Sequence, residues 1–314
     1  MLKQTIESLI KIPGAAQLLI ILRGISQVVL INNALTGAVI LFAIATVSIP
    51  LTIAAFVSSA IGTLTAYWGG ADKNRIRNGL FGFNSVLTGM GLILYLSGPY
   101  KWIIALACAF ITSFMTAALM RAMTPTGLPV LSIPFILITW MILLASYRLK
   151  AFTLTTELMP QNLSNWKLDI SGSINWATGL FDGARQVFFL QNSVAGILIL
   201  IGISIAGWKL GVYALLGNMA ALATAYVLGA EHALIDNGLF GYNAVLAAVA
   251  IGSVYRNPHN KLAPLSAIIA SCLTVLVISA VDSWLLPYGL PALTFPFVLS
   301  TWILLGARKT QMNF

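Results

Sequence analysis

Residues 78–87 read NGLFGFNSVL, and residues 237–246 read NGLFGYNAVL, an offset of 159. A second pair of segments, LPVLSIPF at 128–135 and LPALTFPF at 290–297, repeats at an offset of 162. The first offset also relates three pairs nearer the start of each half: Gln27-Val28 with Gln186-Val187, Asn33 with Asn192, and Gly37 with Gly196. Near-constant spacing over separate motifs indicates an internal duplication.

The composition indicates a membrane protein. Of 314 residues, 59% are hydrophobic and 8% are charged, and the mean hydropathy is +0.93. A soluble domain carries about 25% charged residues, so an ordinary cytosolic enzyme, a coiled coil and a disordered protein are excluded. The apolar runs are continuous over about 20 residues, as in transmembrane helices, whereas barrel strands alternate in polarity over about 10 residues. We therefore expect an all-α polytopic membrane protein.

The charge and the cysteines suggest neither a nucleic-acid partner nor a cofactor. The net charge of +9 fits the excess of Lys and Arg in cytoplasmic loops, and no long basic run occurs. Cys108 and Cys272 lie within apolar segments and are interpreted as small buried hydrophobes. The sequence shows no metal-ligand cluster and no glycine-rich phosphate loop.

Each half divides into six apolar segments. They span about 15–31, 35–50, 51–68, 78–97, 101–120 and 129–147 in the first half, and 174–190, 194–208, 210–228, 238–254, 262–281 and 291–307 in the second. The first segment of each half carries Arg23 or Arg185 and breaks at an amide pair, so we expect a short, tilted or re-entrant helix that faces the protein interior. The predicted domains are a first repeat at 1–150, an extracellular or periplasmic connector at 151–173 and a second repeat at 174–314.

Five full crossings per half require the second repeat to be inverted, and the loop charges agree. One side collects eleven basic residues, with only Glu7 and Asp72 as acidic ones: Lys3, Lys11, Lys73, Arg75, Arg77, Arg121, Lys209, Arg256, Lys261, Arg308 and Lys309. The other side collects four basic and six acidic residues: Lys101, Arg148, Lys150 and Lys167, with Glu157, Asp169, Asp182, Glu231, Asp236 and Asp282. Both termini are therefore predicted to be cytoplasmic.

The polar residues near the middle of the apolar segments are neutral. Gln27 and Gln186 occupy equivalent positions, where they serve either helix–helix hydrogen bonding or, as we favour from their repetition, the lining of a pathway. The paired prolines of the second motif start a helix and also free backbone carbonyls. With the hydroxyls of Ser132 and Thr294, these carbonyls are expected to form a short ladder of hydrogen-bond acceptors.

The NGLFG motif has two interpretations. Its asparagines and glycines fit helix capping and close helix packing. Its aromatic residues, Phe83 and Tyr242, form i, i+4 pairs with Leu87 and Leu246 that fit the wall of a pathway. Because the Tyr242 hydroxyl can tilt toward water, we expect the wall to move more readily at Leu246 than at Leu87.

The duplicated LPxx[ST]xPF motif, the QVxxxxN segment at 27–33 and the repeated NGLFG resemble the urea transporter family, bacterial type, over about 20–307. The resemblance implies two inverted repeats, each with five transmembrane helices and one pore helix. It also implies a homotrimer with one pore per protomer in the lipid bilayer of a bacterial inner membrane, and passive permeation of urea at the interface of the repeats.

The resemblance also implies roles for individual residues. Four residues are expected to form hydrogen bonds to urea: Gln27, Gln186, Ser132 and Thr294. Six residues are expected to form the walls of two apolar slots: Leu30, Phe83, Leu87, Phe189, Tyr242 and Leu246. This sequence departs from the family pattern at Ser132, where threonine is usual, and at Tyr242, where phenylalanine is usual.

Two other classes of membrane protein fit the sequence less well. An ion-coupled secondary transporter of a small neutral amide can share the inverted-repeat plan, but it needs a buried ionisable residue or a cation site, and we expect neither. A membrane-embedded enzyme needs catalytic groups. His232 and His259 fall in opposite loops and no Ser-His-Asp set appears, so the chain is predicted not to be an enzyme.

Overall fold

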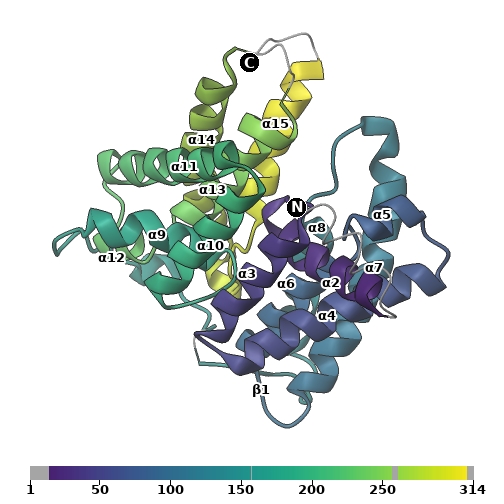
Figure 1. The fold of residues 1–314 in the computed structure, drawn as a ribbon. Coiled ribbons are helices and arrows are strands. Elements are labelled where there is room, and N and C mark those ends of the chain that lie inside the picture. The colour runs from purple at the N-terminus through teal and green to yellow at the C-terminus, as the bar shows by residue number, and fades with distance from the viewer. Residues whose placement is uncertain (1–13, 157, 257–260, 310–314) are drawn as a thin grey trace.

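The computed structural model describes residues 14–156, 158–256 and 261–309, and it is mostly helical. The charges assigned above to Lys3, Glu7, Lys11 and Glu157, and the loop position of His259, lie outside the described residues. Figure 1 shows the earlier and the later parts of the chain as two adjoining groups of helices.

The first group is built from helices that follow the predicted apolar segments. It consists of α2 (Ala15–Ser26) with η1 (Gln27–Val29), α3 (Ala34–Ala45), α4 (Ile49–Trp68), α5 (Lys73–Arg77), α6 (Gly82–Tyr95), α7 (Lys101–Met123) with η2 (Thr124–Thr126), and α8 (Ile133–Ala145). Two short strands, β1 (Leu96–Ser97) and β2 (Thr153–Leu154), pair antiparallel with Leu96 opposite Leu154.

The second group repeats this order of elements. After η3 (Leu163–Asn165) it consists of α9 (Trp176–Gln186), α10 (Ser193–Ala206), α11 (Trp208–Val227), α12 (His232–Asp236), α13 (Gly241–Val249) with the π-helical turn η4 (Ala250–Val254), α14 (Ala263–Leu285) with η5 (Leu286–Tyr288), and α15 (Phe295–Lys309). The packing repeats as well, because α4 lies against α6 and α7 as α11 lies against α13 and α14.

The break predicted after the first apolar segment is present. In the first half, α2 with η1 meets α3 at an angle of 76°, and Asn33 caps α3 by accepting hydrogen bonds from the backbone of Leu35 and Thr36. Asn192 caps α10 in the same way at Val194. An asparagine at this position satisfies backbone N–H groups that a helix start leaves free, so the chain can turn there.

Close packing at each break depends on a glycine. A Cβ at Gly37 would overlap the backbone carbonyl of Leu22, and a Cβ at Gly196 would overlap that of Phe181. Since Leu22 and Phe181 are themselves related by the offset of 159, the two halves cross their first and second helices in the same way.

Helix length supports part of the expected crossing pattern. Among the described residues, α4, α7, α11 and α14 are long and apolar enough to cross a membrane, and α2 with α3 forms one bent candidate. The apolar helices α6, α8, α10, α13 with η4, and α15 have 10–17 residues. Five crossings per half therefore stays a prediction.

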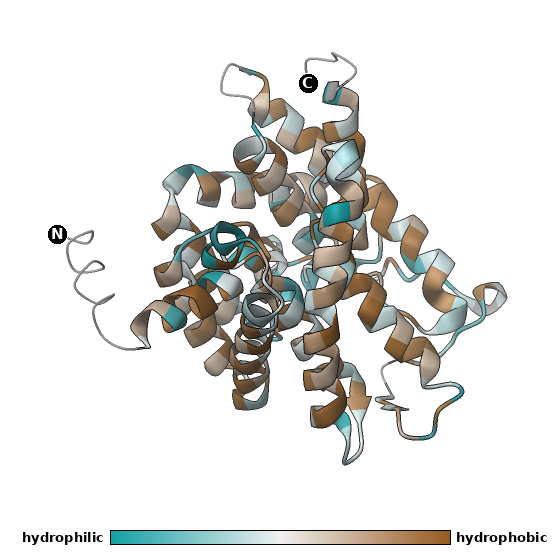
Figure 2. Cartoon of the chain, turned by 90° about the vertical axis from the view of Figure 1, so that its right-hand side faces the viewer, coloured by the Kyte–Doolittle hydropathy of each residue, from teal (hydrophilic) through white to brown (hydrophobic). Residues whose placement is uncertain are grey.

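The outer helix surfaces suit lipid. Figure 2 shows hydrophobic residues along most helices and hydrophilic ones mainly in loops and at helix ends. Large apolar side chains exposed on these helices include Phe42, Ile53, Ile103, Phe110, Phe114, Met141, Ile201 and Leu276. An apolar surface of this extent is costly in water, so the chain is a membrane protein.

Candidate functional site

Two cavities lie at equivalent places in the two halves. The first cavity, of about 970 Å³, is lined by Gln27, Leu30, Phe83 and the segment 127–131, among others. The second cavity, of about 210 Å³, is lined by Gln186, Phe189, Tyr242 and the segment 291–294, among others. The structure thus brings seven of the ten predicted site residues to cavity walls, and all seven fall on repeated positions.

The two central hydroxyls meet between the halves. Ser132 Oγ and Thr294 Oγ1 are 2.6 Å apart, and either can be the donor. Both residues are 3% exposed. Thr294 also lines the second cavity, whereas Ser132 directly follows Leu131 of the first. The pair follows directly on residues 128–131 and 290–293, which we call the LPxL segments. Because Ser132 and Thr294 occupy the same position in their halves, their contact joins the two LPxL segments at one point.

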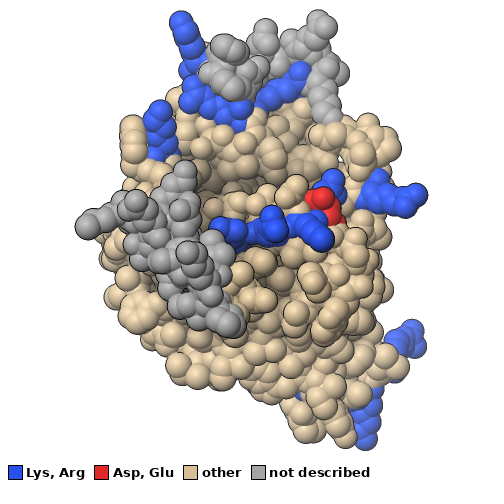
Figure 3. All heavy atoms as spheres, turned by 45° about the vertical axis from the view of Figure 1, so that its right-hand side comes forward, with Lys and Arg blue, Asp and Glu red and all other residues tan. Residues whose placement is uncertain are grey.

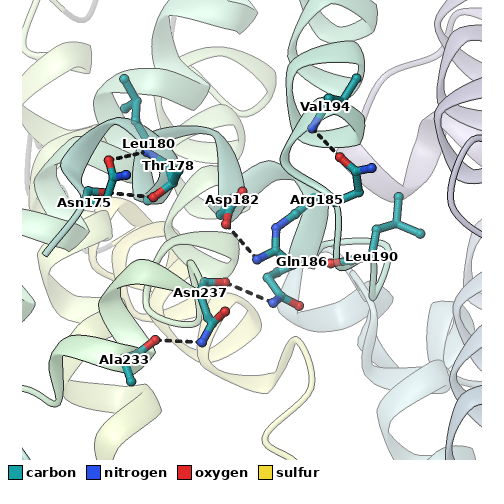
Figure 4. Close-up of polar contacts among 12 residues, drawn as sticks. Asn175, Thr178, Leu180, Asp182, Arg185, Gln186, Leu190, Val194, Ala233 and Asn237 are labelled. Carbon is teal, nitrogen blue, oxygen red and sulfur yellow. Dashed lines mark hydrogen bonds and ion pairs between the residues drawn. The ribbon is translucent and has the colours of Figure 1, made fainter. Parts of the chain in front are cut away.

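The side chains of Gln27 and Gln186 have the same orientation in both halves. Gln27 Nε2 donates to the carbonyl of Asn78 at 2.8 Å, and Gln186 Nε2 donates to that of Asn237 at 3.0 Å. Figure 4 shows the second of these contacts. Since a glutamine amide has one donor end and one acceptor end, anchoring Nε2 leaves Oε1 as the group that each side chain can offer to the cavity.

Four leucine and phenylalanine residues at the cavities have a left-handed backbone. Leu30, Leu131, Phe189 and Leu293 have φ between 52° and 63°, and they are the only described non-glycine residues with positive φ. They form two repeat-related pairs, and each lines a cavity. Such a conformation costs about 1–2 kcal/mol per residue, and strain of this kind concentrates at functional sites.

The asparagines of the NGLFG motifs hold the LPxL segments. Asn84 Nδ2 donates to the carbonyl of Leu131, and Asn243 Nδ2 donates to that of Leu293, each at 3.3 Å. Asn243 Oδ1 also accepts from the backbone N–H of Phe297 at 3.0 Å. These contacts support the structural interpretation of the asparagines.

The Tyr242 hydroxyl has an acceptor within the protein. It does not tilt toward water but donates to the carbonyl of Leu293 at 2.7 Å. A largely buried hydroxyl needs an acceptor, and the non-helical LPxL segment provides one within reach. The ring still lines the second cavity, but one carbonyl of the expected acceptor ladder already has a partner.

Leu87 and Leu246, predicted as slot walls, are almost fully buried at 1% and 2% exposure. Neither is among the residues that line the two cavities. Each lies one helical turn beyond Phe83 or Tyr242, which do line them. The proposed wall role of the two leucines therefore concerns any narrow passage between the cavities rather than the cavities themselves.

A buried ion pair in α9 was missed from the sequence. Asp182, which was counted as a loop charge, is 4% exposed and pairs with Arg185 at 2.7 Å between Oδ2 and NH2. Arg185 NH1 also donates to the carbonyl of Leu190 (Figure 4). In the first half, the equivalent carbonyl belongs to Ile31, and Ser26 Oγ donates to it at 2.6 Å. Only the i, i+3 spacing of the two charges on one helix could have predicted the pair.

The two cavities carry opposite fixed charges. Arg75 and Arg256 line the first cavity, and Figure 3 shows a face on which basic side chains gather beside a hollow and acidic ones are sparse. Asp282 lines the second cavity and accepts a hydrogen bond from the backbone of Ala292. In the part of the chain that the structure describes, no three His, Cys, Asp or Glu residues are grouped to hold a metal ion.

Comparison with known proteins gives a consistent family. The family model described as urea transporter matches residues 18–309. Urea transporter 1 of Ovis aries is 28% identical over 300 residues, which cover 93% of this chain and 77% of that protein. Urea transporter 1 of Rattus norvegicus is 26% identical over 305 residues, with the same coverage.

Proposed function

The chain belongs to the urea transporter family, and we propose that it conducts urea passively, down its gradient, through a pore that joins the first and second cavities. It is a transport protein rather than an enzyme. The observation that carries the proposal is the Ser132–Thr294 hydroxyl pair, which joins the segments that line the two cavities. Each half also contributes one glutamine, Gln27 or Gln186, to its cavity.

The proposal follows from what urea needs to cross a dry passage. Urea is small, flat and neutral, with four N–H donors and one carbonyl. Leaving one such group unpaired in a buried site costs about 1–3 kcal/mol. The four acceptors proposed to replace water are Gln27 Oε1, Ser132 Oγ, Thr294 Oγ1 and Gln186 Oε1. Neutral oxygens bind weakly enough to release the solute, as conduction requires.

The slot walls are proposed to select for a flat solute. Leu30 and Phe83 in the first cavity, and Phe189 and Tyr242 in the second, are apolar surfaces beside the acceptors. Phe189 makes edge contacts with Tyr95 and Phe135, at centroid distances of 6.1 and 6.3 Å. Walls fixed in this way admit a planar molecule and give a hydrated ion nothing to replace its water shell.

We propose that the halves, 1–150 and 174–314, are related by a pseudo-two-fold axis as inverted repeats. Trp140 Nε1 donates to the carbonyl of Pro291 at 2.9 Å, and Trp302 Nε1 donates to that of Pro129 at 2.7 Å. Each tryptophan thus binds the equivalent proline of the other half. Reciprocal contacts of this kind are typical of a two-fold relation, and the Ser132–Thr294 pair, made of equivalent residues, lies where such an axis would pass.

The proposal extends to the assembly and its membrane. We place the protein in a bacterial inner membrane with both termini cytoplasmic and the connector 151–173 outside, and we propose a homotrimer with one pore per protomer. Light scattering on the detergent-purified protein, corrected for bound detergent, tests the trimer, because a monomer or a dimer at working concentration would contradict it.

Stopped-flow flux into proteoliposomes tests the proposed mechanism. We expect urea uptake that saturates weakly and does not respond to sodium or proton gradients. Methylurea, formamide and glycerol, run in parallel, define the selectivity. Uptake that collapses when an ionophore removes the ion gradient would instead support an ion-coupled transporter.

A further inference from the structure

A side pocket of about 310 Å³ adjoins the second cavity. Three residues line both spaces and form the boundary between them: Leu234, Phe240 and Asp282. The remaining walls come from the connector, with Trp166 and Leu168, from the segment that follows α11, with Glu231, and from α14, with Ser279. A volume of this size falls within the range of small-molecule sites, about 300–1,000 Å³.

The side pocket is apolar and carries only negative charge. Its walls are mostly aliphatic, with the rings of Trp166 and Phe240, and its two charged residues are Glu231 and Asp282. No Lys or Arg occurs among the described residues that line either this pocket or the second cavity. Small-molecule sites combine a mainly apolar wall with a few polar groups in this way, and this one is complementary to a cation.

Asp282 breaks the repeat. The residue at the equivalent position of the first half, 162 residues earlier, is Met120, which lines the first cavity. Asp282 therefore gives the second cavity a carboxylate that the described lining of the first cavity lacks, and the backbone of Ala292 donates to it. A neutral solute that only needs acceptor oxygens does not require this charge.

We propose that the second cavity and the side pocket together bind an aryl-substituted guanidinium cation. The inference rests on the proposed function, because the guanidinium group is a planar, N–H-rich analogue of urea and takes urea's place beside Gln186 and Thr294. Its charge pairs with Asp282, since a guanidinium and a carboxylate form charge-assisted, bidentate hydrogen bonds. The aryl group fills the side pocket against Trp166 and Leu168.

Such a cation blocks the pore without crossing it. Beyond the central hydroxyls it would meet Arg75 and Arg256 in the first cavity, and like charges repel. Block is therefore expected from the side of the connector only.

Calorimetry on the purified full-length chain at mildly alkaline pH tests the charge. Phenylguanidinium and phenylurea have nearly the same shape and differ in charge, so we expect the cation to bind at least about tenfold more tightly, as one charge-assisted hydrogen bond provides. Asp282→Asn should abolish the difference. Asp169→Asn is the matched control, because hydrogen bonds from the side chain and backbone of Ser171 hold the pKa of Asp169 below its ordinary value and its carboxylate lies outside both spaces.

A second variant tests the side pocket. Ser279 is exposed at the pocket wall, and its hydroxyl donates only to the carbonyl of Val275 within α14, so Ser279→Phe should fold and fill the pocket. We expect this variant to weaken phenylguanidinium binding at least about tenfold and to leave the binding of unsubstituted guanidinium unchanged. Equal losses for the two ligands would overturn the assignment of the aryl group to this pocket.

Flux measurements separate this inference from the proposed function. Phenylguanidinium added on the connector side should reduce the urea flux of the wild type and of Asp169→Asn, should reduce that of Asp282→Asn and of Ser279→Phe much less, and should have no effect from the other side. Equal affinity for phenylurea and phenylguanidinium, or block from both sides, would overturn the inference. If the wild-type chain binds the cation as described but conducts no urea, then the proposed function fails and the binding site stands.

Discussion

The central hydroxyls of Ser132 and Thr294 are 2.6 Å apart, and one of them donates a hydrogen bond to the other. A hydroxyl has two lone pairs, so each oxygen can still accept an N–H from a passing urea. A substitution can remove either hydroxyl oxygen without disturbing the backbone, so the two acceptors can be tested one at a time.

We predict that Thr294→Val or Ser132→Ala reduces urea flux about tenfold, because each variant removes one acceptor worth about 1–1.5 kcal/mol at the barrier. Stopped-flow flux measures the effect. Thr274→Val is the control, since Thr274 is buried but donates to Ser271 away from both cavities. Wild-type flux in both hydroxyl variants would remove these residues from the pathway.

The left-handed backbone at the cavities gives a second prediction. At an ordinary helical position, glycine is about 1 kcal/mol less stable than alanine. At Phe189, with φ of 58°, only glycine is free of the left-handed penalty. We therefore expect Phe189→Gly to be at least as stable as Phe189→Ala, whereas Leu246→Gly should be less stable than Leu246→Ala.

Thermal unfolding in detergent, followed by tryptophan fluorescence, compares the four variants. Each comparison holds the lost packing constant, because both members of a pair remove the same large side chain. Alanine more stable than glycine by the same amount at both positions would show that Phe189 carries no backbone strain.

At the scale of single elements, α9 differs from its counterpart α2 by the Asp182–Arg185 pair. Removing one partner of a buried ion pair costs about 3–5 kcal/mol, because the other charge is left unpaired. We predict this loss for Asp182→Ala, and a double variant Asp182→Ala/Arg185→Ser that is more stable than Asp182→Ala alone. A serine is chosen at position 185 because the equivalent residue of α2, Ser26, is a serine that donates to the equivalent carbonyl.

The free energy of unfolding in mixed micelles, measured over the full double-mutant cycle, checks this prediction. Arg23→Ser serves as the matched control, because Arg23 lies on α2 and donates to the exposed carbonyl of Arg77. Additive losses at the two α9 positions would mean that the pair contributes no coupling.

Leu87 and Leu246 belong to α6 and α13, and they test whether these helices wall the passage or only fill the core. If the two leucines only fill the core, then changing either one to alanine should lower the free energy of unfolding by about 2–5 kcal/mol and leave the selectivity of transport unchanged. We predict instead that Leu246→Ala also raises dimethylurea flux relative to urea, because a gap of methyl size relieves steric overlap. The ratio of the two fluxes on folded protein decides between the roles.

The helices themselves could be predicted from the sequence, because their apolar segments are bounded by Asn, Gly and Pro. Asn33 and Gly37 determine where α3 begins and how closely it packs on α2, and both residues were visible as repeated positions. The direction of the Tyr242 hydroxyl could not be predicted, because its acceptor, Leu293, comes from a distant part of the chain. The Asp182–Arg185 pair was missed because the net charge of a loop says nothing about burial.

At the scale of the whole molecule, the two halves exchange contacts across their interface. Thr36 Oγ1 on α3 donates to the carbonyl of Gly202 on α10 at 2.8 Å, and the two tryptophan–proline contacts link α8 and α15 to the opposite LPxL segments. Cavities lined by both halves follow from this arrangement. Leu305 of α15 lines the first cavity, and Tyr95 of α6 lines the second.

The distribution of charges predicts the orientation of the molecule, and cysteine labelling of intact cells can test it. Arg75 is exposed on α5, on the side that collects most of the basic residues, whereas Ala233 is exposed on α12, between Glu231 and Asp236. The positive-inside rule places the first side in the cytoplasm. In a background that lacks Cys108 and Cys272, we predict that an impermeant maleimide labels Ala233→Cys in intact cells and labels Arg75→Cys only after lysis.

If the halves were parallel rather than inverted, α5 and α12, which are equivalent elements, would face the same side and both positions would label alike. Ready labelling of position 75 in intact cells would therefore contradict the predicted orientation, and equal labelling of the two positions would contradict the inverted repeat as well.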